Sequence, residues 1–274
     1  MRSRSDFLQT ISCSLAFAAL LVLHIPCASA AFPNFDKINE SLKKAQDTAG
    51  KVGRVAKGAA GLSLEEEIAI GDSVAIEIVS RHDGLWKDEP ATKRVNLVGR
   101  VLARYAERQD LEWRFGILNS DTINAFSAPG GRVFITRGLY QLADDDDKLA
   151  GVLAHEIAHI DQRHALRIIA RGELLGGVSE LVADRSSDFA QYEQAISDIT
   201  GELLDKGYDP NSEYDADKRG RALAKTTGFA PGGLRATLET LKASSAGRKE
   251  ETFSTHPPLD NRIKRLPNDP APKS

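Results

Sequence analysis

Cysteine is almost missing from this chain. The only two, Cys13 and Cys27, lie near the N-terminus. The rest of the 274-residue chain therefore owes nothing to disulfides, even in an oxidising compartment. The same distribution leaves no cysteine nucleophile in the body of the protein.

Several other features are missing, and each absence excludes a class of protein. We find no glycine-rich phosphate loop, no dinucleotide-binding fingerprint and no internal repeat. The formal net charge is −3 and no broad basic surface can be inferred, so we expect no nucleic-acid partner. Apart from one stretch near the N-terminus, the sequence has no long apolar run. Its length suits one sizeable domain.

The N-terminal apolar stretch, residues 11–25, follows a start that contains two arginines. Ala28-Ser29-Ala30 comes directly after it and has the A-x-A form of a cleavage site. We therefore expect residues 1–30 to be a signal peptide cleaved after Ala30, and the protein, if bacterial, to be exported to the periplasm or beyond. An uncleaved membrane anchor is an alternative, although a span needs about 20 residues. A lipoprotein modified at Cys27 fits less well.

Residues 31–63 form an N-terminal extension rich in lysine and small residues. Between residues 35 and 56 its apolar side chains follow a spacing of three and four, which predicts an amphipathic helix, although several glycines weaken it. Such a helix would lie on the domain or act as a tether. The alternative is a peripheral contact of residues 31–60 with anionic lipid or an envelope protein.

The most informative motif is His155-Glu156-Ile157-Ala158-His159, an H-E-x-x-H box. Residues four apart share one face of a helix, with Cβ atoms roughly 5–6 Å apart, so both imidazoles can reach one metal ion. Glu156 would then lie beside the open position of the metal, where it can take a proton from water. The bare box occurs by chance in roughly one chain per hundred of this length, so its surroundings matter.

Those surroundings favour a helix. Apolar residues at helical spacing accompany the box, and four aspartates, residues 144–147, precede it. An aspartate can cap the first turn and suits the positive end of the helix dipole. A calcium site is the alternative for the acidic run, but the oxygen-rich spacing of a calcium loop is missing. The sequence predicts a helix from near Asp145 to about Ala170.

A catalytic zinc site needs three protein ligands plus water, so one ligand must come from another segment. Glu213 and Asp217 are four apart on a predicted helix that starts after Asp209-Pro210. One carboxylate could bind the metal, and the other could accept the free N–H of a ligating imidazole. An ordinary acidic helix face is the alternative, and spacing alone leaves the two equal.

Four segments carry a family resemblance. They are residues 149–160 with the box, Glu213-Tyr214-Asp215-Ala216-Asp217 with its E-x-x-A-D pattern, residues 124–135, and the segment from His256 to Ile263. In their order along the chain they resemble the HtpX-like and CAAX-prenyl-protease-like zinc metallopeptidases, family forty-eight of the metallopeptidases. The resemblance implies an α+β, mostly helical, zincin-like (gluzincin) domain over residues 64–267, with a small β-sheet or hairpin beside the metal-binding helix. Residues 268–274 would form a disordered tail.

The resemblance also implies roles for single residues. One zinc ion would be bound by His155, His159 and Glu213, with Glu156 as general base and Asp217 orienting one of the histidines. Two further residues, His256 and Arg262, would act near the substrate carbonyl, where hydrolysis builds negative charge. His256 could instead move onto the metal and leave the enzyme latent, or be a plain loop histidine.

The segment before the box contains two short β-prone runs, residues 113–118 and 132–136, around a Pro-Gly-Gly turn. We expect one strand to form the rim of the active-site cleft, where an extended peptide could add by backbone hydrogen bonds. Three residues at this rim are candidates for substrate binding: Asn124, Ala125 and Phe126. A purely structural hairpin is compatible with this interpretation.

Elsewhere the sequence predicts helices over residues 64–80, 91–108, 188–206 and 231–242. It also predicts a connection over 172–187, and over 243–255 a loop that is either a lid or without a gating role. The leading functional hypothesis is a zinc-dependent endopeptidase for unfolded or extended polypeptides, acting on misfolded or unassembled cell-envelope proteins. Two alternatives stay open: a largely latent protein with a chaperone-like or adaptor role, and a zinc hydrolase of a non-peptide substrate.

Overall fold

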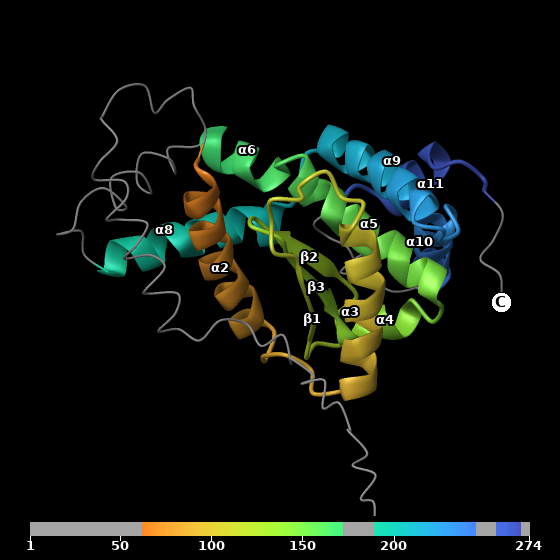
Figure 1. Cartoon of the computed structure of the whole chain (residues 1–274), viewed down its shortest axis with the longest axis horizontal. Coiled ribbons are helices and arrows are strands. Elements are labelled where there is room, and N and C mark those ends of the chain that lie inside the picture. Colours follow the sequence, from red (N-terminus) through yellow and green to blue (C-terminus); the bar gives the residue numbers. More distant parts are fainter. Residues whose placement is uncertain (1–61, 172–188, 245–255, 270–274) are drawn as a thin grey trace, which may run out of the picture. The chain divides into compact units, whose positions relative to one another are not determined.

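The computed structural model describes residues 62–171, 189–244 and 256–269. The predicted signal peptide, the N-terminal extension, the connection over 172–187 and nearly all of the loop before His256 lie outside the described residues. The described part is mostly helical with one small three-stranded sheet, which confirms the predicted fold class (Figure 1). None of its helices combines the length and the apolar character needed to cross a membrane.

The first two helices carry clear start signals. α2, Leu64–Arg81, begins with a capping box, in which Ser63 and Glu66 each accept the other's backbone N–H through their side chains. α3, Glu89–Ala103, is capped by Asp88 and has a proline in its first turn. Both helices are predicted by the sequence, although α3 ends at Ala103 and not at Arg108 as expected.

The sheet has the order β1-β3-β2. It consists of β1 (Arg114–Leu118), β2 (Ala125–Ala128) and β3 (Arg132–Thr136). β2 and β3 form an antiparallel hairpin whose turn uses Gly130 and Gly131 at φ 73° and 88°, a region that favours glycine. β1 instead runs parallel to β3. The hairpin expected over residues 124–135 is therefore present, whereas the predicted run at residues 113–118 joins the sheet as a parallel neighbour of β3.

The metal-binding helix is shorter than predicted. After the short α4 (Arg137–Leu142), α5 spans Asp146–Asp161, and Asp145 caps it by accepting the N–H of Lys148. The chain then turns at Arg163, which has a φ of 54°, and α6 (His164–Arg171) begins. The expected single helix to Ala170 is therefore wrong, because a left-handed residue ends α5. In addition, α5 is buried all round from Leu149 to Ile160 and not along one stripe only.

The later helices complete the described part of the chain. They are α8 (Phe189–Gly201), a π-helical turn (Glu202–Lys206), α9 (Pro210–Thr226), α10 (Gly233–Ser244) and α11 (Leu259–Arg265). α5 packs against α3 and the sheet on one side and against α9 and α10 on the other (Figure 1). α2 contacts β2 and β3, and α11 packs on α9 and α10. This central position explains why α5 has no exposed face.

Candidate metal centre

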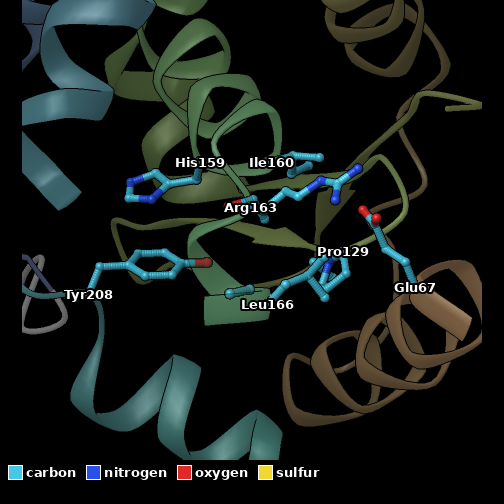
Figure 2. A pocket seen from close by; sticks show the side chains of 10 residues that line it. Glu67, Pro129, His159, Ile160, Arg163, Leu166 and Tyr208 are labelled. Atoms are coloured by element: carbon cyan, nitrogen blue, oxygen red, sulfur yellow. The ribbon is translucent and has the colours of Figure 1, made fainter. Parts of the chain in front are cut away.

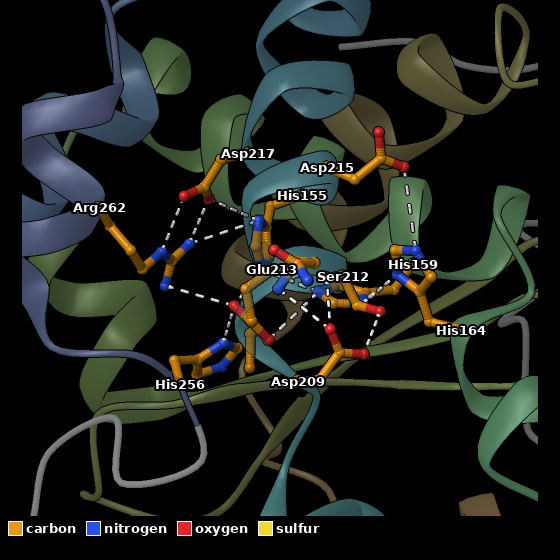
Figure 3. Close-up of polar contacts among 12 residues, drawn as sticks. His155, His159, His164, Asp209, Ser212, Glu213, Asp215, Asp217, His256 and Arg262 are labelled. Atoms are coloured by element: carbon orange, nitrogen blue, oxygen red, sulfur yellow. Dashed lines mark hydrogen bonds and ion pairs between the residues drawn. The ribbon is translucent and has the colours of Figure 1, made fainter.

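α5 directs the rings of His155 and His159 toward one point (Figure 3). Their Nε2 atoms are 3.1 Å apart, and both side chains are buried. Glu213, in the first turn of α9, places Oε2 3.6 Å from His155 Nε2 and Oε1 3.6 Å from His159 Nε2. The structure thus brings the three predicted ligands into one group whose ligand atoms lie within 4.8 Å of one another.

The donor set fits a zinc ion. Zinc ligands lie about 2.0–2.2 Å from the metal in a tetrahedron, which sets neighbouring ligand atoms roughly 3.3 Å apart, close to the separations seen here. Glu213 Oε1 is buried and accepts no hydrogen bond from any residue that the structure describes, which is costly for a carboxylate oxygen unless a cation or donor meets it. His155, His159 and Glu213 could therefore hold one zinc ion.

The approach of α9 to α5 depends on a glycine. A Cβ at Gly220 would lie 2.7 Å from the backbone nitrogen of His155, so any side chain there would push the two helices apart. Asp209 caps α9 by accepting the N–H groups of Asn211 and Ser212. The ionised Glu213 therefore lies at the positive end of a well-formed helix.

The carboxylate of Asp217 supports His155 from behind. Its Oδ1 lies 3.0 Å from His155 Nδ1, and Arg262 donates to both of its oxygens at 3.0 and 2.5 Å. Burial raises the pKa of Asp217, but Arg262 and His155 hold that pKa at about 2. Burial also raises the pKa of Glu213, yet His256 and His155 keep it well below its usual value. Both carboxylates are thus ionised.

The two C-terminal candidates also reach this centre. His256 is half-buried, and its Nδ1 lies 2.7 Å from Glu213 Oε2. The guanidinium of Arg262 is fully buried behind Asp217, with Nη1 3.9 Å from Glu213 Oε2. The position of Arg262 makes it a support for the two carboxylates. Contact of either residue with a substrate carbonyl stays a prediction.

The predicted substrate-binding residues begin strand β2. Asn124 is half-buried and its Oδ1 accepts the backbone N–H of Ala125, while the side chains of Ala125 and Phe126 are buried. β2 is an edge strand, and among the described residues no strand pairs with its outer side. Substrate contact there stays a prediction, and it would involve backbone groups, since the side chains of Ala125 and Phe126 are buried.

Two aromatic residues near His159 escaped the sequence analysis. His164 is buried, and its Nδ1 lies 2.8 Å from His159 Nδ1. The ring of Tyr208 stacks on His159 with centroids 4.1 Å apart and 20° between the planes. Burial and the charge of Glu156 raise the pKa of the Tyr208 phenol, so it stays protonated. On one continuous helix a residue five positions after His159 would face another way, so spacing gave no signal for His164.

A small pocket opens on this side of His159 (Figure 2). It is lined by His159, Tyr208, the β2 residues Ser127 and Ala128, and apolar residues of α5 and α6 that include Ile160. The pocket therefore joins the candidate metal centre to the edge strand.

Residues 89–269 match peptidase family M48. The chain belongs to peptidase family M48. This assignment confirms the resemblance stated above and places the chain in a class of metallopeptidases, as the sequence predicts. The three candidate ligands and the residues behind them all lie within the matched region.

Named relatives support the same class. The chain is 27% identical over 235 residues to a beta-barrel assembly-enhancing protease of Yersinia pestis, covering 82% of this chain and 47% of the relative. It is 28% identical to the mitochondrial metalloendopeptidase OMA1 of Schizosaccharomyces pombe, over 75% of this chain and 61% of the relative. It is 24% identical to the metalloprotease YcaL of Escherichia coli, over 76% of this chain and 81% of the relative. The chain thus spans about half the length of the first of these relatives.

Proposed function

We propose that this M48 protein is a zinc-dependent endopeptidase that cleaves unfolded or extended polypeptides. The observation that carries the proposal is the convergence of His155, His159 and Glu213, with Glu156 on the same buried helix. Two imidazoles and one carboxylate suit zinc better than magnesium or calcium. The family match and the relatives named as metalloproteases support the activity.

Each part of the site has a separate role in hydrolysis. When bound, zinc lowers the pKa of a water and polarises the scissile carbonyl. Glu156 takes the proton from the attacking water and passes it to the leaving amine, so no covalent enzyme intermediate forms. Asp217 holds His155 in the tautomer that frees Nε2. The free edge of β2 binds substrate backbone in an extended form.

The proposed compartment is the periplasm, with residues 1–30 as the signal peptide that leads there. The proposed substrates are misfolded or unassembled envelope proteins. The name of the Yersinia pestis relative, a beta-barrel assembly-enhancing protease, supports a role near the envelope. Any envelope contact would use the domain surface or residues 31–60.

A second candidate function is supported by His256. Its Nδ1 lies 2.7 Å from Glu213 Oε2, so the imidazole occupies space beside a candidate ligand that a substrate would need. The chain would then be largely latent and would act mainly by binding polypeptides, as a chaperone or adaptor. Binding of this kind does not need Glu156.

Cleavage of an unfolded protein separates the two candidates. Residues 31–274 and the same chain with Glu156→Gln are incubated with casein, with and without zinc. Zinc-dependent cleavage that the variant loses by about 100-fold or more would support the endopeptidase. Tight zinc binding without cleavage, with casein bound equally by both chains, would favour the latent function.

A further inference from the structure

His164 is a buried histidine that the proposed reaction does not use. Its side chain is 1% exposed, and its Nδ1 lies 2.8 Å from Nδ1 of His159. A neutral imidazole has one donor nitrogen and one acceptor nitrogen.

The contact fixes where the protons lie. If Nε2 of His159 binds the metal, the ring proton of His159 must be on Nδ1. Two nitrogens 2.8 Å apart can form a hydrogen bond only when one donates and the other accepts. His164 Nδ1 must then accept, and its own proton must lie on Nε2.

The far nitrogen of His164 agrees with this arrangement. His164 Nε2 is buried and has no direct hydrogen-bond partner among the described residues, but Asp215 Oδ2 lies 3.9 Å away (Figure 3). A carboxylate at that distance favours a proton on Nε2, because the N–H dipole points toward its negative charge. The opposite tautomer would turn a lone pair toward Asp215.

The break between α5 and α6 makes the contact possible. On a continuous helix His159 and His164 would differ by roughly 140° around the axis. The left-handed residue Arg163, with φ 54°, starts a new helix and returns His164 to the ring of His159. A non-glycine residue with positive φ is strained, and such residues are frequent near functional sites.

We infer that His164 is a positioning residue of the metal centre, which accepts the Nδ1–H of His159 and so holds Nε2 toward the metal. The inference rests on the proposed zinc site. His164 itself does not touch the metal. Its role is to fix the tautomer and the ring orientation of a ligand, as second partners of ligating histidines do in zinc sites.

Three substitutions separate hydrogen bonding from packing. In His164→Asn, Oδ1 lies near the place of Nδ1 and can accept, whereas in His164→Gln the acceptor lies further out, near Nε2. His164→Leu fills the space without any acceptor. Full-length wild type and variants are stripped of metal, and zinc affinity is measured by competition with a chelating dye. The visible spectrum of the cobalt-loaded chains reports the geometry of the site independently of activity.

We expect zinc affinity to fall about 10- to 100-fold in His164→Leu and His164→Gln, and to stay within about 3-fold of wild type in His164→Asn. The cobalt spectrum should change in the first two variants only. Equal affinity in all chains would overturn the inference, as would an equal loss in His164→Asn and His164→Gln. If His164→Leu does not fold, the difference in zinc affinity between His164→Asn and His164→Gln still tests the inference. A wild type that binds no zinc would overturn the proposed function as well.

Discussion

His155 and His159 face the same point from one helix, but different chemistry lies behind each ring. Behind His155 is the carboxylate of Asp217, ion-paired with the fully buried Arg262. Behind His159 is another imidazole, that of His164. Burial and Arg262 lower the pKa of His155, but bonds to Asp217 and Glu213 raise it to about 9, whereas burial keeps that of His159 well below normal.

The two supports also differ in their origin along the chain. The support of His155 comes from α9 and α11, and α11 is held in place by Arg235, which donates to the carbonyls of Ile263 and Leu266. The support of His159 is local and depends on the turn at Arg163. One ligand thus depends on long-range packing of charged groups, and the other depends on a local break in a helix.

The largest expected effect is on the support of His155. Arg262→Ala leaves Asp217 and Glu213 buried without their cation, so we expect the metal-free protein to lose about 3–5 kcal/mol of unfolding free energy. Urea unfolding measures this loss. Arg221→Ala is the control, because its partly exposed ion pair with Asp269 should contribute about 1 kcal/mol or less. Equal losses of unfolding free energy in the two variants would show that the buried network of Arg262 contributes no more than a partly exposed ion pair.

A second prediction compares the two carboxylates directly. Asp217→Asn should weaken zinc binding about 10- to 100-fold, because Asp217 contacts a ligand at 3.0 Å. Asp215→Asn should change it by less than about 3-fold, since Asp215 lies 3.9 Å from His164 and is partly exposed. Titration of metal-stripped protein with zinc measures both. A larger loss of zinc affinity in Asp215→Asn than in Asp217→Asn would contradict this prediction.

A third prediction concerns pH. The pKa of His164 is about 4 in the folded chain, against 6.5 for an unperturbed histidine. As pH falls below 6.5 the unfolded state binds a proton first, so the unfolding free energy decreases down to about pH 4. His164→Asn removes this group, and its stability should depend less on pH over that window. Denaturant unfolding of the metal-free chains at several pH values checks it, and identical pH profiles would contradict it.

The smallest effect is expected at the turn itself. Arg163→Gly removes the side chain from a residue with φ 54°, so relief of strain offsets the larger entropy of the unfolded chain. We expect a change in unfolding free energy of about 1 kcal/mol or less, with zinc affinity unchanged. Arg163→Val is the matched control and should destabilise, because a β-branched residue resists positive φ. A loss of zinc affinity in Arg163→Gly would mean that the arginine side chain also supports the site.

Much of the fold could be predicted from local signals. Capping residues such as Ser63 and Asp145, and Pro210 at the start of α9, mark helix starts because they satisfy free backbone groups at once. The parallel pairing of β1 with β3 could not be predicted this way, since it depends on contacts between strands separated along the chain. The same holds for the complete burial of α5, because hydrophobic periodicity does not show a helix enclosed on two sides.

The sequence by itself determined His155, Glu156 and His159 as candidates, because four-residue spacing on a helix places the two histidines on one face whatever the rest of the chain does. The roles of Glu213 and Asp217 came from the family resemblance, since spacing alone left an ordinary acidic helix face equally possible. Only the tertiary structure decided which histidine Asp217 supports and that His164 lies behind the other one. The approach of α9 at Gly220 brings Asp217 to His155, and the left-handed turn at Arg163 brings His164 to His159. Such contacts depend on helix approach and backbone turns, which side-chain spacing does not encode.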